Sequence, residues 1–288
     1  MDKYLTKKEV EDYWKILIKK DIDLFVYSLS TNNLSKKWQF IFRNKILDLI
    51  IPEKVKIGTL EFDKNYCEME SLISKSKSKS NYLSIHSVMI RDLIRNLNTN
   101  SYCLIIDIDA FPLSKYAIKL SFVLAMLKGI NGNIQRTNCI ENGEHLFIGP
   151  SYICFNTETI KELKEAAWIA NERSDVSEEI TWERPDLIDN NLFKPLKTIF
   201  NPIWALEGEN KVYGIGTTFG YNNFPINYHH FYSRNFAARL HFFLISFFKY
   251  LKIKSNIKKS KKTKIKDILK LILEESKFTI KYLLGKIL

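Results

Sequence analysis

The chain has 288 residues and a mass of 33.9 kDa, a length that fits one or two domains. Its apolar content of 45% excludes global disorder, and 10 Gly and 7 Pro exclude a collagen-like or linker-dominated chain. No apolar run reaches the ~18–20 residues of a membrane-spanning helix. The four cysteines form no CxxC pair, so we expect a reduced, cytoplasmic chain without structural zinc.

The net charge of +12 is concentrated at one end of the chain. Residues 249–288 contain 13 Lys and 3 acidic residues, whereas the remaining residues contain 31 basic and 29 acidic side chains. A protein that acts on nucleic acid is expected to carry its positive charge at the binding cleft. The nearly neutral body therefore predicts no nucleic-acid partner.

The apolar pattern of the first part of the chain predicts alternating helices and strands. We expect helices at residues 7–19, 35–51 and 86–97. We expect strands between and after them, at residues 22–28, 55–62 and 102–113. This order predicts an α/β sheet, whose ligands bind beyond the carboxyl ends of its strands.

The second half of the chain has a less regular pattern. Residues 145–156 predict a pair of strands, and residues 157–172 predict a helix with a Thr cap. The low-complexity stretch SKSKSKSN at 74–81 predicts an exposed loop.

The expected strand at residues 102–113 carries two acidic residues after its apolar run. In YCLIIDIDAFPL, Asp107 and Asp109 follow an apolar run that is typical of a central parallel strand. Carboxylate oxygens are hard ligands for Mg²⁺ or Mn²⁺, and such ions complete their shell with phosphate oxygens. The pattern favours a divalent metal that binds a nucleoside diphosphate and stabilises it as a leaving group. Two solvated aspartates at a strand end are the alternative.

Three segments together resemble the nucleotide-binding half of a GT-A glycosyltransferase: IDLFVYSLSTNN, HSVMIRDLIRNL and YCLIIDIDAFPL. The resemblance covers about residues 20–160 and rests on motifs, chiefly the Asp-x-Asp at the end of a central strand. It implies one Rossmann-like GT-A domain, a nucleotide-diphospho-sugar transferase, over residues 1–248. The implied activity is metal-dependent transfer of a sugar from a nucleotide-sugar donor to a hydroxyl of a glycan or lipid-linked acceptor, as in surface polysaccharide synthesis.

The resemblance also implies roles for individual residues. Asp109 would bind Mn²⁺ or Mg²⁺, and Asp107 would share the metal or contact the donor ribose. A late histidine completes the metal shell in many members, which makes His229 and His230 candidates. The residues expected near the donor base, ribose, sugar or diphosphate are Tyr27, Ser28, Leu29, Ser30, Arg91 and Asp92.

An inverting reaction would also need a carboxylate base near the acceptor hydroxyl. The acidic stretch SDVSEEITWERPDLIDN contains the candidates Glu179, Glu183, Asp186 and Asp189. Each of them is equally compatible with a solvated surface charge. The sequence contains no clear base motif, so both inverting and retaining stereochemistry stay open.

Residues 249–288 have a pattern of their own. Ile and Leu recur at helical spacing with lysines mainly between them, which predicts a basic amphipathic helix that lies on an anionic membrane surface. We therefore expect a peripheral protein at the cytoplasmic face of a membrane. A solvated helix packed on the body and a disordered basic end are the alternatives.

Two other kinds of protein share parts of this pattern. A haloacid-dehalogenase-like phosphohydrolase also has an Asp-x-Asp after a strand and uses the first Asp as its nucleophile. Phe111 stands where that family normally has Thr or Val, and about a hundred residues precede the motif here. A non-enzymatic peripheral membrane protein with inert aspartates is the other alternative.

Overall fold

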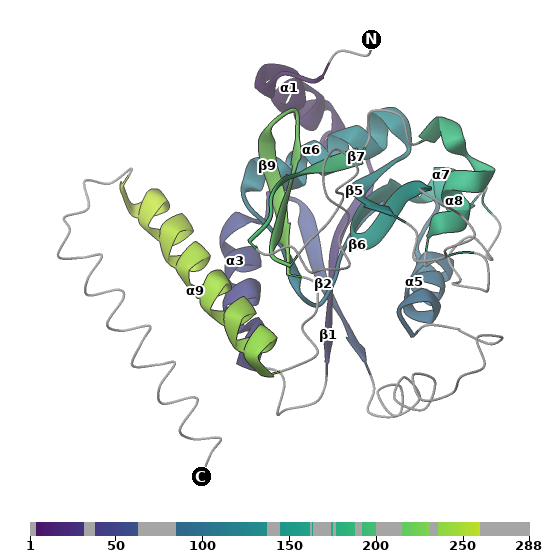
Figure 1. The fold of residues 1–288 in the computed structure, drawn as a ribbon. Helices are drawn as coiled ribbons and strands as arrows, with labels where there is room; N and C mark the ends of the chain where they lie inside the picture. Colours follow the sequence, from purple (N-terminus) through teal and green to yellow (C-terminus); the bar gives the residue numbers. More distant parts are fainter. Residues whose placement is uncertain are drawn as a thin grey trace, which may run out of the picture.

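The structure, a computed structural model, describes residues 4–31, 38–62, 85–136, 145–161, 163, 174, 177–187, 192–199, 215–230 and 236–259. In this part of the chain, a mixed nine-stranded sheet lies between two layers of helices (Figure 1). The expectation of an α/β fold is confirmed, and the arrangement is compatible with a Rossmann-like domain.

The strands form one continuous ladder in the order β2-β1-β3-β6-β5-β7-β8-β9-β4. β2, β1 and β3 are parallel, whereas β6 runs antiparallel to both β3 and β5. Their bounds are β1 (Asp23–Thr31), β2 (Val55–Phe62), β3 (Ser101–Ile106), β4 (Ala110–Pro112), β5 (Ile130–Arg136), β6 (Leu146–Asn156), β7 (Leu192–Lys197), β8 (Thr217–Tyr221) and β9 (Phe224–His229).

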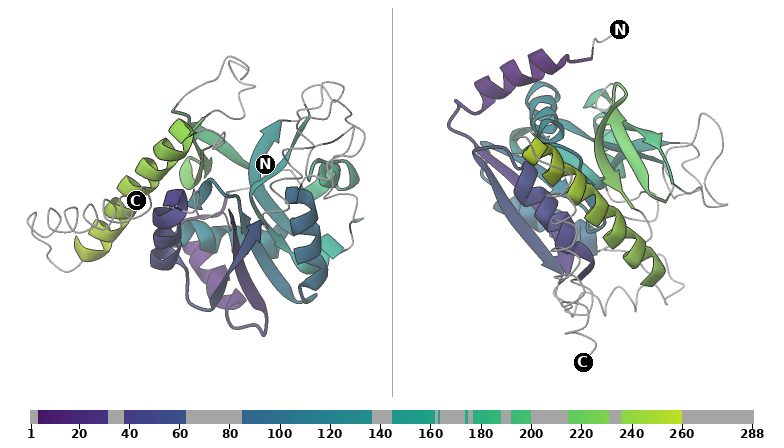
Figure 2. Two further views of the ribbon diagram at one scale, coloured as in Figure 1. Left: turned by 90° about the horizontal axis from the view of Figure 1, so that it is seen from below. Right: turned by 90° about the vertical axis from the view of Figure 1, so that its left-hand side faces the viewer.

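The helices cover both faces of this sheet, and a separate apolar cluster lies under each layer. On one face lie α1 (Lys7–Leu17), η1 (Trp38–Phe40), α3 (Ile41–Ile50), α6 (Lys115–Lys128) and α9 (Phe236–Lys259). On the other lie α5 (Ile85–Asn96), α7 (Thr157–Lys161) and α8 (Glu178–Glu183), followed by the short turn η5 (Pro185–Leu187). Figure 2 shows α3 and α9 side by side on one side of the strands and α5 on the opposite side.

Local sequence signals explain several of the element boundaries. α1 begins with a capping box, in which the Thr6 side chain accepts from the Glu9 amide and the Glu9 side chain accepts from the Thr6 amide. α6 begins at the N-cap Ser114 and ends at Gly129, whose φ of 83° favours glycine. All six residues of β3 are buried, as expected for a central strand covered on both faces.

The helix α9 joins the body through aromatic rings. The ring of Phe42 in α3 lies 5.2 Å from Phe243, 4.8 Å from Phe247 and 5.5 Å from Tyr250. The expected division between residues 248 and 249 therefore falls inside a helix that remains packed on the body at Tyr250 and Leu251. Residues 260–288, which contain most of the predicted amphipathic helix, lie outside the described residues.

The sequence expectations and the observed elements differ at a few places. The strand expected at 55–62 is β2, whereas the expected strand pair at 145–156 is the single strand β6. No element was expected between residues 113 and 145, where the structure has α6 and β5. The expected loop at 74–81 lies outside the described residues, as does most of the helix expected to follow Lys161.

Among the helices of the described ranges, none has the length and apolar character required to cross a membrane.

Candidate metal centre

The Asp-x-Asp motif lies in the short connection between β3 and β4. β3 ends at Ile106 and β4 begins at Ala110, so Asp107 and Asp109 follow the carboxyl end of a central strand, as expected, although β3 is parallel to β1 and antiparallel to β6. β4 pairs antiparallel with β9, and this register places Ala110 opposite His229. The amide of His230 also donates to the carbonyl of Asp109 at 2.9 Å. Sheet pairing therefore brings a histidine from late in the chain to the motif.

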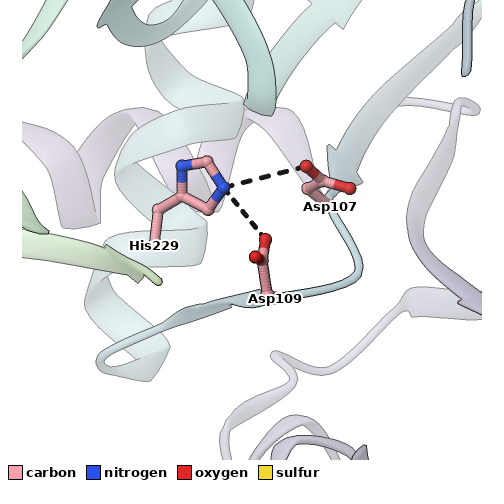
Figure 3. Close-up of side chains that lie close together, drawn as sticks. All are labelled: Asp107, Asp109 and His229. Carbon is pink, nitrogen blue, oxygen red and sulfur yellow. Dashed lines mark ion pairs between the residues drawn. The ribbon is translucent and has the colours of Figure 1, made fainter. Parts of the chain in front are cut away.

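Three side chains converge at this point (Figure 3). His229 Nε2 lies 3.0 Å from Asp109 Oδ1 and 3.7 Å from Asp107 Oδ2, and one ligand atom from each residue lies within 4.8 Å of the others. Asp109 and His229 are each only 4% exposed, whereas the Asp107 side chain is 22% exposed. The group is therefore nearly closed on one side and open to solvent at Asp107.

The donor set fits a divalent cation. Two ligand atoms at neighbouring corners of an octahedron, each ~2.1 Å from the ion, lie roughly 3 Å apart. The separation of His229 Nε2 and Asp109 Oδ1 has this value, whereas Asp107 Oδ2, 3.7 Å from His229 Nε2, would have to move slightly closer to occupy a neighbouring corner. Carboxylate oxygens suit Mn²⁺ or Mg²⁺, whereas an imidazole nitrogen is a ligand that Zn²⁺ and Fe²⁺ also accept. Asp107, Asp109 and His229 are thus the residues that could hold a metal.

His230, the other histidine candidate, lies on the opposite side of β9, because neighbouring side chains of a strand alternate between its faces. Its Nδ1 forms a hydrogen bond of 2.9 Å with the Tyr228 hydroxyl, and its ring centroid lies 5.0 Å from that of His241 and 5.8 Å from that of Phe242. Burial lowers the pKa of His230 to about 4, so the ring is neutral at pH 7. The structure brings His229, and not His230, to the two aspartates.

A buried polar network supports the metal group from the sheet. The amide of Asp107 donates to the carbonyl of Ser151 at 2.9 Å, and Asn133 Nδ2 donates to Ser151 Oγ at 3.0 Å. The side-chain amides of Asn133 and Asn227 bond reciprocally, at 3.0 and 2.7 Å. Asn227 precedes His229 by two residues on β9, so this network connects the strands that carry Asp107 and His229. Fully satisfied buried networks of this kind hold a single arrangement.

A buried arginine supports the group from the helix side. Arg43, in α3, is fully buried, and its Nη1 donates to the carbonyls of Leu29 at 2.6 Å, Ile108 at 2.9 Å and Asp107 at 3.5 Å. Its Nε and Nη2 both donate to Asn44 Oδ1. One side chain therefore ties the end of β1 to the Asp-x-Asp connection.

The positive charge of Arg43 also interacts with the two aspartates of the site. Burial lowers its pKa to about 10, while the nearby charges of Asp107 and Asp109 oppose this shift. The guanidinium remains protonated at neutral pH beside two carboxylates. Arg43 was not among the predicted site residues. The signal that could have identified it is a charged residue on the apolar side of an amphipathic helix, in line with Ile46 and Leu47.

The donor-site candidates occupy two different places. β1 pairs with β3 so that Ser28 lies opposite Ile106, and the end of β1 is therefore next to the metal group. Ser28 and Ser30 are buried there, whereas the ring of Tyr27 packs on Phe25 at 5.6 Å.

Arg91 and Asp92 form an ion pair on α5. Within the described ranges, their other polar contacts are with Arg95 and Asn96 of the same helix. The structure thus brings β1, but not this pair, to the aspartates.

The base candidates that the structure describes lie in and just after α8, in the helix layer that also contains α5 and α7. Glu179 and Glu183 belong to α8, which packs on β6, and Ser174 Oγ donates to Glu179 at 2.7 Å. Asp186 is exposed and bonds bidentately to Arg184, which lowers its pKa. Asp189 lies outside the described residues. Asp186 is thus held as a surface ion pair.

No protein-family model matches the sequence, and no curated protein matches it either. The function is therefore inferred from the chemistry of the site.

Proposed function

We propose that this protein is a metal-dependent glycosyltransferase of the GT-A type. It would move a sugar from a nucleotide-sugar donor to a hydroxyl of a glycan or lipid-linked acceptor, as in surface polysaccharide synthesis. The observation that carries the proposal is the convergence of Asp107, Asp109 and His229 beyond the carboxyl end of β3. That edge is where α/β sheets bind their ligands.

In this proposal, Asp107, Asp109 and His229 hold Mn²⁺ or Mg²⁺. Bound there, the ion would neutralise the charge that develops on the leaving diphosphate. The site is preorganised, because Arg43 binds the carbonyl of Ile108 and the Asn133–Asn227 side-chain pair links β5 to β9. Preorganised ligands require no rearrangement when the charge develops.

The donor nucleoside would lie at the end of β1. Residues 27–30 are adjacent to the aspartates through the parallel pairing of β1 with β3. The partial exposure of Asp107 leaves one side of the metal group accessible to a diphosphate. This arrangement supports a donor that extends from β1 across the Asp-x-Asp connection.

Phosphate-ester hydrolysis, with Asp107 as the nucleophile, is supported less well. Asp107 Oδ1 accepts a hydrogen bond from the amide of Ile108 at 2.6 Å, and Oδ2 faces His229 Nε2 at 3.7 Å. One oxygen is thus occupied by a main-chain amide and the other faces a histidine, an arrangement that suits a metal ligand better than a nucleophile. A phosphatase activity that disappears in Asp107→Asn would favour this second function.

The acceptor would be used at the cytoplasmic face of a membrane. The lysine-rich residues 249–288 support peripheral binding to anionic lipid, since each Lys near such a surface contributes ~1 kcal/mol. A lipid-linked acceptor would then be presented at the surface on which the enzyme binds.

A panel of nucleotide-sugars tests the proposed donor class. With Mn²⁺ present, one of them should stabilise the protein by about 2.7 kcal/mol at 100 times its Kd, because it binds only the native state. This corresponds to a rise in melting temperature of roughly 5–10 °C. The measurement is differential scanning fluorimetry with and without Mn²⁺, followed by a transfer or hydrolysis assay with the stabilising donor. If no nucleotide-sugar or nucleoside diphosphate shifts the melting temperature in a metal-dependent way, the proposed function is wrong.

A further inference from the structure

The helix α9 carries a row of exposed apolar side chains. Leu240 is 37% exposed, Leu244 is 40% exposed and Phe248 is 63% exposed. A spacing of four residues places all three on one face of the helix. Phe248 is the most exposed of the large apolar side chains in the described residues.

The opposite face of α9 is firmly packed, so the direction of this row is fixed. Phe242, Phe243 and Tyr250 are buried, and their rings pack on aromatic side chains of η1, α3 and β4. Figure 2 shows α9 lying against α3, on the side of α3 that faces away from the strands. The row therefore faces away from the body.

The charge of α9 shows what kind of surface would fit this row. Its 24 residues contain five Lys and one Arg, and no Asp or Glu. Lys252 is exposed and lies one further step of four residues beyond Phe248, so the apolar row passes into a basic one. The sequence continues with another eight Lys and three acidic residues between 260 and 288.

We propose that the row Leu240, Leu244 and Phe248 is the surface on which the protein docks to an anionic lipid membrane. Apolar side chains that enter the headgroup region, beside lysines that pair with lipid phosphates, are the pattern of helices that lie in a membrane interface. A second copy of the chain fits this face poorly, since two helices without acidic residues would repel each other. Nucleic acid would use the lysines but not the apolar row.

The helix that carries the docking surface packs against the two strands that position the metal group. The ring of Phe242 lies 5.9 Å from Phe111 in β4 and 5.8 Å from His230, which directly follows β9. β4 and β9 are the strands that bring Asp109 and His229 together. Docking through α9 would thus hold the metal group at a fixed height above the lipid. This inference uses none of the metal ligands and stands whether or not the proposed catalysis is correct.

The test is vesicle co-sedimentation of the full chain carrying Leu240→Gln, Leu244→Gln and Phe248→Gln together. The vesicles contain phosphatidylcholine alone or phosphatidylcholine mixed with phosphatidylglycerol. The wild type should bind the mixed vesicles and release them as ionic strength rises from roughly 0.05 to 0.5 M. The triple variant should bind at least about tenfold more weakly, because each apolar side chain contributes to insertion. A matched control replaces Ile57, Leu127 and Leu146, which are similarly exposed on other elements, by Gln and should bind as the wild type does.

Two further measurements keep the outcomes distinct. Mn²⁺ binding and the melting temperature should be unchanged in the triple variant, since the three side chains are exposed and lie outside the metal group. Undiminished vesicle binding by the triple variant would overturn the inference. A wild-type dimer that the triple variant converts to a monomer, without any change in vesicle binding, would overturn it in favour of self-association. Loss of vesicle binding in the Ile57/Leu127/Leu146 control would overturn it as well.

Discussion

Asp109→Asn is expected to weaken Mn²⁺ binding by about 100-fold or more. Loss of a residue that merely supports a ligand costs 10–100-fold in metal affinity, so loss of a ligand charge should reach at least the upper end of that range. Asp109 is almost fully buried, and its Oδ1 lies 3.0 Å from His229 Nε2. Asn has nearly the same size but lacks the negative charge. Isothermal titration calorimetry, or the signal of free Mn²⁺ in electron paramagnetic resonance, measures the effect.

The matched control is Asp186→Asn, which neutralises an exposed carboxylate that pairs with Arg184. This variant should bind Mn²⁺ as the wild type does. Circular dichroism melting curves of both variants separate metal binding from folding. Retention of wild-type Mn²⁺ affinity by a folded Asp109→Asn variant would remove the metal assignment, and with it the basis for the proposed transfer reaction.

Arg43→Met is expected to lower the free energy of unfolding by about 3–5 kcal/mol, because buried main-chain carbonyls would lose a charged donor and each hydrogen bond to a charged group contributes ~1.5–3 kcal/mol. The Arg43 guanidinium donates to the carbonyls of Leu29, Asp107 and Ile108, and a Met side chain supplies no donor. Asp107 and Asp109 would also lose the neighbouring positive charge. Arg43→Lys keeps the charge but only one donor nitrogen, so its stability should lie between Met and the wild type.

Urea denaturation, followed by circular dichroism, measures this difference. Arg184→Met is the control, because Arg184 forms a partly exposed surface pair with Asp186 and its loss should change stability by only about 0.5 kcal/mol. Equal urea midpoints for Arg43→Met and the wild type would show that the buried guanidinium does not hold β1 and the Asp-x-Asp connection together.

Local sequence patterns predicted an element correctly where the residues of that element alone determine its conformation. The strand β2 at Val55–Phe62 was predicted at its observed bounds, since an apolar and β-branched run shows its period directly. α6 was not predicted, although the N-cap Ser114 and the final Gly129 are local signals of its two ends. β6 was mistaken for two strands because Gly149 and Pro150 interrupt its pattern, whereas pairing with β3 and β5 keeps it continuous.

The sequence by itself determined the α/β class and the strand that ends in Asp107 and Asp109, because apolar periodicity and short motifs are local properties. The late histidine became a candidate ligand only through the resemblance to GT-A glycosyltransferases. Only the tertiary structure decided between His229 and His230, since the choice depends on which face of β9 lies toward the two aspartates. It also brought Arg43, Asn133 and Asn227 to the site from three separate elements. Contacts of this kind depend on sheet order and helix packing, and no stretch of neighbouring residues encodes them.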